Sequence, residues 1–255
     1  MIPNTDVWTL SFHMTEYTPA EIERMTGVST DSQRDWRRHG YLPKHDTHAR
    51  FTILSAAEIY VMKMFADQGK GPVVSSAYAP RIALSMVKTA LMWRKDVWES
   101  DPVSVFDSIP ELGRSRTGSE RARHENGEDW REASYDQKIE WLVDQLLLGM
   151  GVREYVAHSR QAIWWPNGEV EIGFYDGDKL RVAAEGSPLD RVDPKFDGPA
   201  SVLDMEATAA NLARRSRLPF ISVALDVNES GVINRPELRR NHGKVLITSG
   251  KQKAS

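Results

Sequence analysis

Two helix-start signals, each followed by a glycine, lie between Thr18 and Gly40, and they constrain the fold more than any other feature of this chain. Thr18 offers an N-cap hydroxyl, Pro19 suits the first helical position, and Glu21 stands three residues after the cap, the pattern of a capping box. Gly27 tolerates the left-handed conformation that ends a helix. The sequence therefore predicts a short helix that ends at Gly27.

A second helix is expected after only a few residues. Ser29 or Thr30 can cap it, Val28 and Trp36 are its expected anchors in the core, and Gly40 stops it. Two short helices joined by so tight a turn are typical of a helix-turn-helix. We therefore predict that the second helix lies on the surface and presents its polar side chains to a partner.

The polar side chains of this second helix suit DNA. Arginine matches guanine edges and phosphates with two parallel hydrogen bonds, and glutamine can pair with adenine. From Arg34 to Arg50, five Arg or Lys stand against two Asp, so a locally positive surface is expected. A solvated surface helix could carry a similar set. The set consists of Thr30, Ser32, Gln33, Arg34, Arg37 and Arg38.

The segment after the second helix predicts a wing and a third helix. Lys44 to Phe51 is a polar loop that returns to an aromatic residue, as expected for two short strands. Ser55 and Glu58 form another Ser-x-x-Glu start, and apolar residues at helical spacing follow, so a third helix should close the core. The order of parts is that of a winged helix-turn-helix.

Taken together, these residues resemble the DNA-binding domain of the MerR (mercury-resistance regulator) family. The resemblance covers about a fifth of the chain and implies a winged helix-turn-helix in a sequence-specific, DNA-binding transcriptional regulator. The matching segments are Tyr17-Thr18, Thr26-Gly27-Val28-Ser29, Gly40-Tyr41-Leu42-Pro43, Arg50-Phe51 and Ser55-x-x-Glu58.

The chain departs from the family pattern in two places. Most members have Arg-Tyr-Tyr-Glu in the recognition helix, whereas this chain has Arg34-Asp35-Trp36-Arg37, so the family's half-site preference does not transfer. After the third helix, Gly69-Lys70-Gly71-Pro72 interrupts the chain and no heptad run follows, so the family's long dimer coil is not expected.

Eleven residues are predicted to contact double-stranded DNA. Those expected in the major groove are Ser29, Thr30, Gln33, Arg34, Arg37 and Arg38; those expected on the backbone are Lys44, His48 and Arg50 in the wing, with Tyr17 or Thr18 at the first helix. A homodimer is expected because one such domain covers only a short site. The hypothesis requires guanidinium groups that neither turn inward nor pair with acids of the same molecule.

Composition limits the remaining possibilities. The 255 residues, 40% of them hydrophobic, can bury a core and allow about two domains, and a net charge of −3 argues against wrapping nucleic acid by bulk positive charge. The chain has no cysteine, no apolar run long enough to span a membrane and no signal-peptide pattern, so a cytoplasmic protein is expected. No cofactor is predicted.

The rest of the chain predicts further helices and a small sheet. Apolar spacing predicts helices at about 81–98 and 135–150, each a candidate for either internal core or a dimer surface. The Asn167-Gly168 pair predicts a tight hairpin within a three-stranded meander, followed by a helix at 203–215 and a buried strand at 219–227. Trp164 and Trp165 could line a ligand pocket, although core packing is the simpler interpretation.

The predicted fold class is α+β, with an N-terminal winged helix-turn-helix, central helices and a small C-terminal α+β domain containing an antiparallel meander. The predicted parts are an N-terminal extension (1–16), the MerR-like domain (17–71), a helical region (72–151) with a polar linker at 113–131, the α+β domain (152–240) and a basic tail (241–255). The tail could add a phosphate contact or be a solvated end.

Signals for catalysis and metal binding are weak. Phosphate-loop, nucleophile-elbow and zinc-protease motifs are missing from the sequence, so no enzymatic activity is predicted. His45 and His48 could bind a metal, but their place in the wing favours phosphate or water. Residues 226–237 fit the spacing of a calcium loop, yet the strand-like sequence before them favours a hairpin turn. We expect no metal.

Two other functions fit the same residues. One is an architectural, excisionase-like protein that bends DNA. The length of the chain after the winged domain argues against this function. The other is a protein-interaction adaptor with a vestigial winged helix, whose working part is the C-terminal α+β domain. Whether a small molecule acts as an effector is left open by the sequence.

Overall fold

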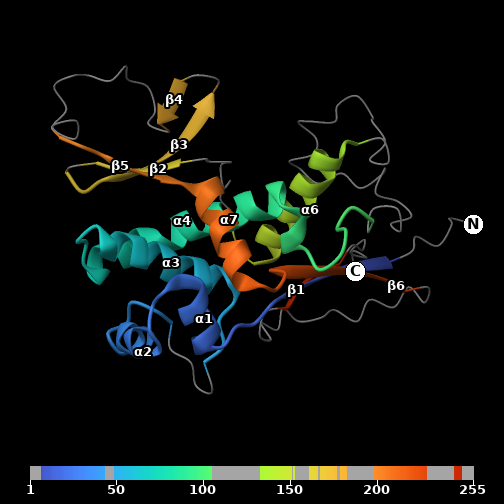
Figure 1. Cartoon of the computed structure of the whole chain (residues 1–255). Helices are drawn as coiled ribbons and strands as arrows, with labels where there is room; N and C mark the ends of the chain where they lie inside the picture. Colours follow the sequence, from blue (N-terminus) through green and yellow to red (C-terminus); the bar gives the residue numbers. More distant parts are fainter. Residues whose placement is uncertain are drawn as a thin grey trace, which may run out of the picture. The chain divides into compact units, whose positions relative to one another are not determined.

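The computed structural model has α+β architecture and divides into two compact units, each of which is described by itself (Figure 1). The structure describes residues 7–43, 49–104, 133–150, 152, 161–165, 167–176, 179–182, 198–228 and 244–248. The first unit combines Met1–Thr15, Lys95–Glu154 and Pro219–Ser255, and the second combines Glu16–Arg94 and Tyr155–Leu218.

Four helices of the second unit follow one another along the chain, and a fifth, which comes much later in the sequence, packs with them on a shared core. They are α1 (Pro19–Thr26), α2 (Thr30–Arg38), α3 (Ile53–Asp67), α4 (Pro72–Trp93) and α7 (Met205–Ser216). α3 lies against α4, and α1 contacts α2, α3 and α7. Buried Ile22 and Met25 from α1 and Ile59 from α3 contribute to this core. The first two helices have the predicted limits.

Two helix starts differ from the prediction. α3 begins at Ile53 because Thr52, not Ser55, is the N-cap: the Thr52 hydroxyl accepts the N–H of Ser55 at 3.5 Å. The next helix was expected at 81–98 but starts at Pro72, directly after Gly71, and ends at Trp93. Proline suits a first helical position, so the segment expected to interrupt the chain supplies a helix start.

α7 belongs to the same unit as the N-terminal helices, although it lies far from them in sequence. The hydroxyls of Tyr17 and Ser216 share a hydrogen bond of 3.0 Å. Arg215 donates to the Met25 carbonyl at 3.3 Å, and its guanidinium lies 5.5 Å from the centre of the Tyr60 ring. These contacts correct the prediction that α7 belongs to a separate C-terminal domain.

A four-stranded antiparallel sheet completes the second unit. Its strands are β2 (Gln161–Trp164), β3 (Val170–Asp176), β4 (Lys179–Val182) and β5 (Ser201–Asp204), in the order β4-β3-β2-β5. The meander β2-β3-β4 is as predicted, and β5 adds a strand at the other edge of β2. The Trp165 N–H donates to the Glu169 carbonyl at 2.9 Å, so the turn is longer than the tight two-residue type.

The first unit contains a three-stranded antiparallel sheet built from the two ends of the chain. β1 (Val7–Met14) lies between β6 (Ile221–Asn228) and β7 (Lys244–Thr248). α6 (Tyr135–Gly149) contacts β7, and a short 3-10 helix, η1 (Lys95–Val97), precedes a bridge between Trp98 and Ile221. Leu10 and Phe12 of the central strand are fully buried.

This sheet changes the predicted domain boundaries. Residues 1–16 were expected to be an extension, but they supply the central strand; residues 241–255 were expected to be a tail, but they supply β7. The predicted 152–240 domain is divided, because β6 pairs with β1 rather than with the meander. The linker at 113–131 lies outside the described residues, as does most of the 226–237 segment that fits a calcium loop.

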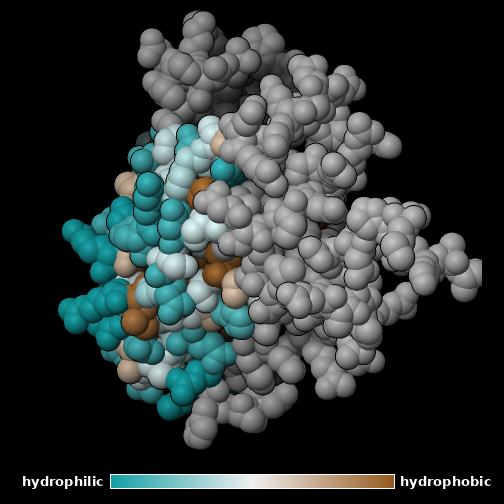
Figure 2. Space-filling view, turned by 90° about the vertical axis from the view of Figure 1, so that its right-hand side faces the viewer, coloured by the Kyte–Doolittle hydropathy of each residue, from teal (hydrophilic) through white to brown (hydrophobic). Residues whose placement is uncertain are grey.

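The described surface is mainly hydrophilic on the face shown in Figure 2, where small brown patches are separated by teal residues. The larger apolar side chains that reach solvent are Val73, Val74, Trp93, Leu148, Val202 and Leu218. None of the helices in the described ranges combines the length and apolar character needed to cross a membrane.

Candidate nucleic-acid interface

The start of α1 is held by the capping box that the sequence predicts. The Thr18 backbone N–H donates to the Glu21 carboxylate at 2.7 Å, and the Glu21 N–H donates to the Thr18 hydroxyl at 3.3 Å. The hydrogen bond from the Thr18 backbone, followed by that from its hydroxyl, lowers the pKa of Glu21. Gly27 ends the helix with a φ of 77°. Thr18 thus has a structural role whether or not it contacts DNA.

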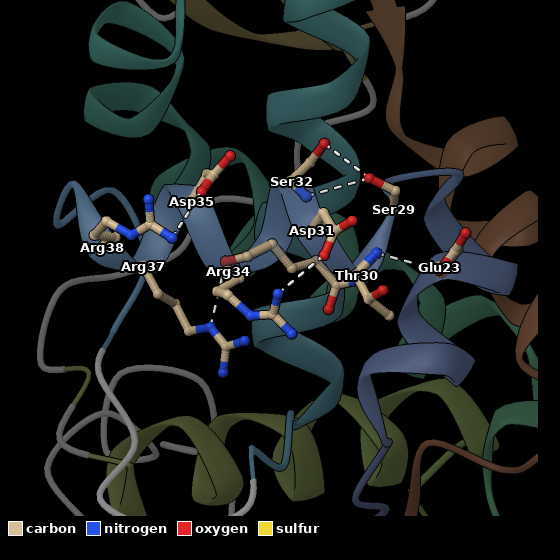
Figure 3. A network of polar contacts seen from close by, with 10 residues as sticks. Glu23, Ser29, Thr30, Asp31, Ser32, Arg34, Asp35, Arg37 and Arg38 are labelled. Carbon is tan, nitrogen blue, oxygen red and sulfur yellow. Dashed lines mark hydrogen bonds and ion pairs between the residues drawn. The ribbon is translucent and has the colours of Figure 1, made fainter.

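Two side chains, those of Ser29 and Glu23, accept backbone N–H groups at the start of α2. The Ser29 hydroxyl accepts the Ser32 N–H at 3.2 Å, and the two serine hydroxyls lie 2.9 Å apart. The Glu23 carboxylate on α1 accepts the Thr30 N–H at 3.2 Å (Figure 3). The amide of Thr30 is therefore occupied, and an acid stands at the end of α2 that was expected to meet bases.

Gln33 fixes the turn between α1 and α2 from the inside. Its side chain is 0% exposed, and its Nε2 donates to the carbonyls of Pro19 at 3.0 Å and Val28 at 2.9 Å. Its Oε1 is buried without a hydrogen-bond partner among the described residues. The prediction that Gln33 contacts adenine is corrected: its amide lies in the core and cannot reach a base edge without unfolding the turn.

The outer face of α2 carries as many acids as arginines. Residues 31, 34, 35 and 38 share one face of a helix, opposite Gln33. Arg34 pairs with Asp31 at 3.0 Å and Arg38 pairs with Asp35 at 3.4 Å, and all four side chains are more than half exposed (Figure 3). This face has no net charge. The expected positive surface was counted over residues 34–50, of which 44–48 lie outside the described residues, so it stays a prediction.

Arg37 lies at the edge of this face and forms no ion pair within the described part of the chain. Its Nε donates to the Gln33 carbonyl at 3.3 Å, and its guanidinium carbon lies 5.6 Å from the centre of the Phe51 ring. In Figure 3, the Arg34 and Arg37 side chains leave α2 on the same side, away from the Asp35–Arg38 pair. Arg37 is half-buried, and its remaining guanidinium donors point away from the helix.

The residues expected to contact the DNA backbone lie in different environments. Tyr17 is fully buried, and its hydroxyl is bonded to Ser216, so the prediction that it holds a phosphate is corrected. Its backbone pairs with Phe51 in both directions, at 2.8 and 3.0 Å, which closes the loop after α2. Arg50, beside this bridge, is exposed. Lys44 and His48 lie outside the described residues.

The sequence analysis counted Asp35 but missed the other two acids of this surface, Glu23 and Asp31. Glu23, Asp31 and Asp35 each satisfy a donor of α2 or of its arginines. The i,i+3 spacing of Asp31 with Arg34 and of Asp35 with Arg38 was visible in the sequence, and such pairs form readily on a helix surface. Asp31 and Glu23 lie outside the range 34–50 over which the charge was counted, so that count overestimates the positive charge of the α2 surface.

In comparisons with known proteins, no protein-family model, no curated protein and no solved structure matches the chain. Within the described ranges, no group of three or more His, Asp or Glu side chains is placed to hold a metal ion. His45 lies outside those ranges. The surface of α1 and α2 must therefore be interpreted from its own chemistry.

Proposed function

We propose that the chain is a sequence-specific DNA-binding transcriptional regulator whose α1, α2 and following loop form a winged helix-turn-helix. One observation carries the proposal: α2 is locked to α1 through Gln33, while its opposite face is exposed and presents Arg34 and Arg38, with the half-buried Arg37 at its edge. A recognition helix needs this combination of a rigid inner face and an exposed polar outer face.

Arg34 and Arg38 pair with acids of the same molecule, so the requirement that these guanidinium groups be unpaired is not met. We retain the proposal because both ion pairs are exposed and such pairs are weak. Exposed pairs between neighbouring turns contribute roughly 0.3–0.5 kcal/mol, so an arginine can exchange its aspartate for a guanine edge or a phosphate at small cost. The aspartates stay close to the DNA and oppose binding to a phosphate backbone. The arrangement therefore favours sites that offer a good base contact over random DNA.

Within this proposal the residues have different tasks. Arg34 and Arg38 contact bases, with Ser29 and Thr30 at the start of the helix, while Arg37 and Arg50, which have no acid bonded in the described structure, hold phosphates together with Lys44 and His48 of the loop. Two copies on a symmetric site supply the specificity that one short domain lacks, so a cytoplasmic homodimer is part of the proposal.

The test is a titration of fluorescent DNA from the region upstream of the protein's own gene against random DNA of equal length. Arg34→Ala should weaken binding to the specific site by about 1–3 kcal/mol and leave random DNA almost unchanged. Arg37→Ala should weaken both equally and reduce the salt slope by about 1. Arg81→Ala, at an exposed position of α4, is the matched control and should change neither.

Failure of the wild-type protein to shift either DNA at low salt would reject the proposal. The charge-balanced outer face of α2 then favours the second candidate, a protein-interaction adaptor, because a surface with paired acids and arginines suits a polar protein partner. Retention of DNA with bending but without sequence preference would instead indicate an architectural protein.

A further inference from the structure

A pocket of about 250 Å³ lies in the second unit, between α3 and the strands β2, β3 and β5. Nine of the twelve described residues that line it are apolar. An apolar cavity of about 150 Å³ in another protein binds benzene, a ring of six carbons. At the same filling, this pocket holds roughly ten non-hydrogen atoms, the size of one ring with a short substituent.

The floor of the pocket is apolar and its rim is partly polar. Val61, Ile163 and Trp164 line it and are at most 6% exposed, so they form the floor. Val202 also lines the pocket but is 56% exposed, and the neighbouring Ser201 is exposed as well. A large apolar side chain that is open to water beside an apolar floor is a surface that a ligand can cover. The hydrocarbon part of a ligand therefore belongs on the floor, and its polar group belongs at the rim.

Packed rings fix the shape of one wall. Phe65 and Trp164 both line the pocket and meet edge-to-face, with ring centres 4.4 Å apart. Tyr78 packs edge-to-face against the same Trp164 ring at 5.9 Å. Because these rings already hold one another, binding does not have to order them, which lowers its entropic cost. A preformed aromatic wall suits a ligand with a ring.

The charges around the pocket favour a neutral ligand. Asp67 lines the pocket, and its carboxylate is bonded to Lys63 on the previous turn of α3. An anion would meet this carboxylate, whereas a cation would have to compete with Lys63 for it. The Lys70 ammonium lies 5.2 Å from the centre of the Trp164 ring and also repels a cation. A neutral polar group avoids both repulsions.

We propose that this pocket binds a small neutral amphipathic molecule, with one hydrocarbon ring and a polar group such as a hydroxyl, of roughly ten non-hydrogen atoms. The ring lies against Phe65 and Trp164 and covers Val202, and the hydroxyl stays at the rim with the exposed Ser201 and Gln68. The inference goes beyond the proposed function and does not rest on it, because binding at this pocket requires no DNA.

The binding test uses the full chain and a series of neutral probes that differ by one methylene each: benzyl alcohol, 2-phenylethanol, 3-phenylpropanol and 4-phenylbutanol. Ligand-observed NMR titration measures their dissociation constants. Burial of one methylene strengthens binding about fourfold, so affinity should rise up to 3-phenylpropanol, which matches the expected size, and then level off. Absence of saturable binding, or a rise that continues at 4-phenylbutanol, would overturn the site.

A variant at the rim locates the site without disturbing the core. Val202→Trp places a larger side chain at the opening, so the pocket no longer buries the ring and 3-phenylpropanol should bind at least about tenfold more weakly. Leu148→Trp is the matched control, because Leu148 on α6 is 54% exposed and does not line the pocket. Equal effects of the two substitutions would overturn the site.

A variant at the floor tests where the ring lies. Val61 is 0% exposed and lines the pocket from α3, so Val61→Ala makes the floor deeper. In this variant 4-phenylbutanol should bind about two- to fourfold more tightly than 3-phenylpropanol, a gain that the wild type lacks. No gain in a variant that circular dichroism shows to be folded would overturn the placement of the ring on this floor.

Two charged probes of nearly the same shape test the neutral class. These are 3-phenylpropanoate, which is an anion at neutral pH, and 3-phenylpropylamine, which is a cation. Because each ion meets a like charge at the rim, both should bind about two- to fivefold more weakly than 3-phenylpropanol. Binding of either ion as tight as that of the alcohol would overturn the neutral class.

Discussion

The α1–α2 pair and the β6-β1-β7 sheet are built from opposite kinds of contact. The N-cap hydrogen bonds of α1 and α2 join residues three positions apart, Thr18 with Glu21 and Ser29 with Ser32. The sheet joins β1, near the start of the chain, to strands beyond residue 220, with Leu10 opposite both Leu225 and Ile247. The α1–α2 pair is specified by contacts between residues close in sequence. The sheet, in contrast, forms only when the two end regions of the chain come together.

This difference predicts where the chain is most sensitive to substitution. A local cap contributes about 1 kcal/mol and is one of several for its helix, so its loss can be absorbed. The central strand of a three-stranded sheet has no such redundancy, because both neighbours pair with it alone. The following changes test the contrast.

Phe12→Ala should have the largest effect on stability. Phe12 is fully buried in the central strand, and removal of a buried phenylalanine ring costs about 3–5 kcal/mol. Urea unfolding followed by circular dichroism measures the loss. Phe12→Leu, which keeps most of the volume, should cost less than about 1.5 kcal/mol. A loss below 1 kcal/mol for the alanine variant would show that β1 is not the strand on which this sheet depends.

The same contrast explains which parts of the fold the sequence predicts. The Thr18 and Ser29 caps and the glycine at position 27 have local signatures, so α1 and α2 were found with their limits. Strand partners have no such signature: apolar alternation in 219–227 predicted a buried strand but could not show that its neighbour lies at Val7–Met14. The domain boundaries were wrong for this reason.

Gln33→Leu should have the next largest effect, because it removes a contact that joins two local elements. The variant leaves the Pro19 and Val28 carbonyls without their side-chain donor, at a cost of about 1–3 kcal/mol. The buried Oε1 has no partner to lose, which places the effect toward the lower end. Urea unfolding of this variant and of Ser32→Ala, a control on the same helix, measures the loss of stability. Equal stability of the two variants would show that Gln33 does not stabilise the turn between α1 and α2.

Gln33 also shows how far the candidate site could be predicted. A glutamine can contact an adenine or serve as a hydrogen-bond donor in the core, and only the face of α2 on which Gln33 lies decides between them. Arg34, Arg37 and Arg38 were expected at the surface, and Arg34 and Arg38 are exposed. Their aspartate partners depend on side-chain geometry, which residue types alone do not fix.

Thr18→Ala should destabilise the chain by about 1 kcal/mol, as expected for loss of an N-cap hydroxyl. Thr18→Ser keeps the hydroxyl and is the matched control. A thermal melt of both variants measures the difference. A loss as large as that of Phe12→Ala would abolish the contrast between local and long-range contacts.

Glu21→Gln and Glu58→Gln should change the pH dependence of stability in opposite directions. Hydrogen bonds from Thr18 lower the pKa of Glu21, so its contribution is present above the pKa of the unfolded chain and is lost as pH falls. Burial raises the pKa of Glu58, so the wild type loses stability as pH rises from the unfolded to the folded pKa. At neutral pH Glu21→Gln should be less stable than wild type and Glu58→Gln more stable, and urea unfolding at pH 4 and pH 7 compares them. The same sign for both at neutral pH would contradict these environments.

The smallest effect on stability should come from the outer face of α2, where Asp31→Asn and Asp35→Asn each remove an exposed ion pair. Each should cost less than about 0.5 kcal/mol, since solvent and salt screen such pairs. Their effect on DNA should be larger than their effect on stability, because each change removes a negative charge next to an arginine that meets a phosphate or base. The double variant should therefore bind random DNA more tightly and discriminate less between random and specific DNA. Unchanged DNA binding with unchanged stability would mean that this face does not approach DNA, and the paired acids and arginines would then belong to a surface for a protein partner.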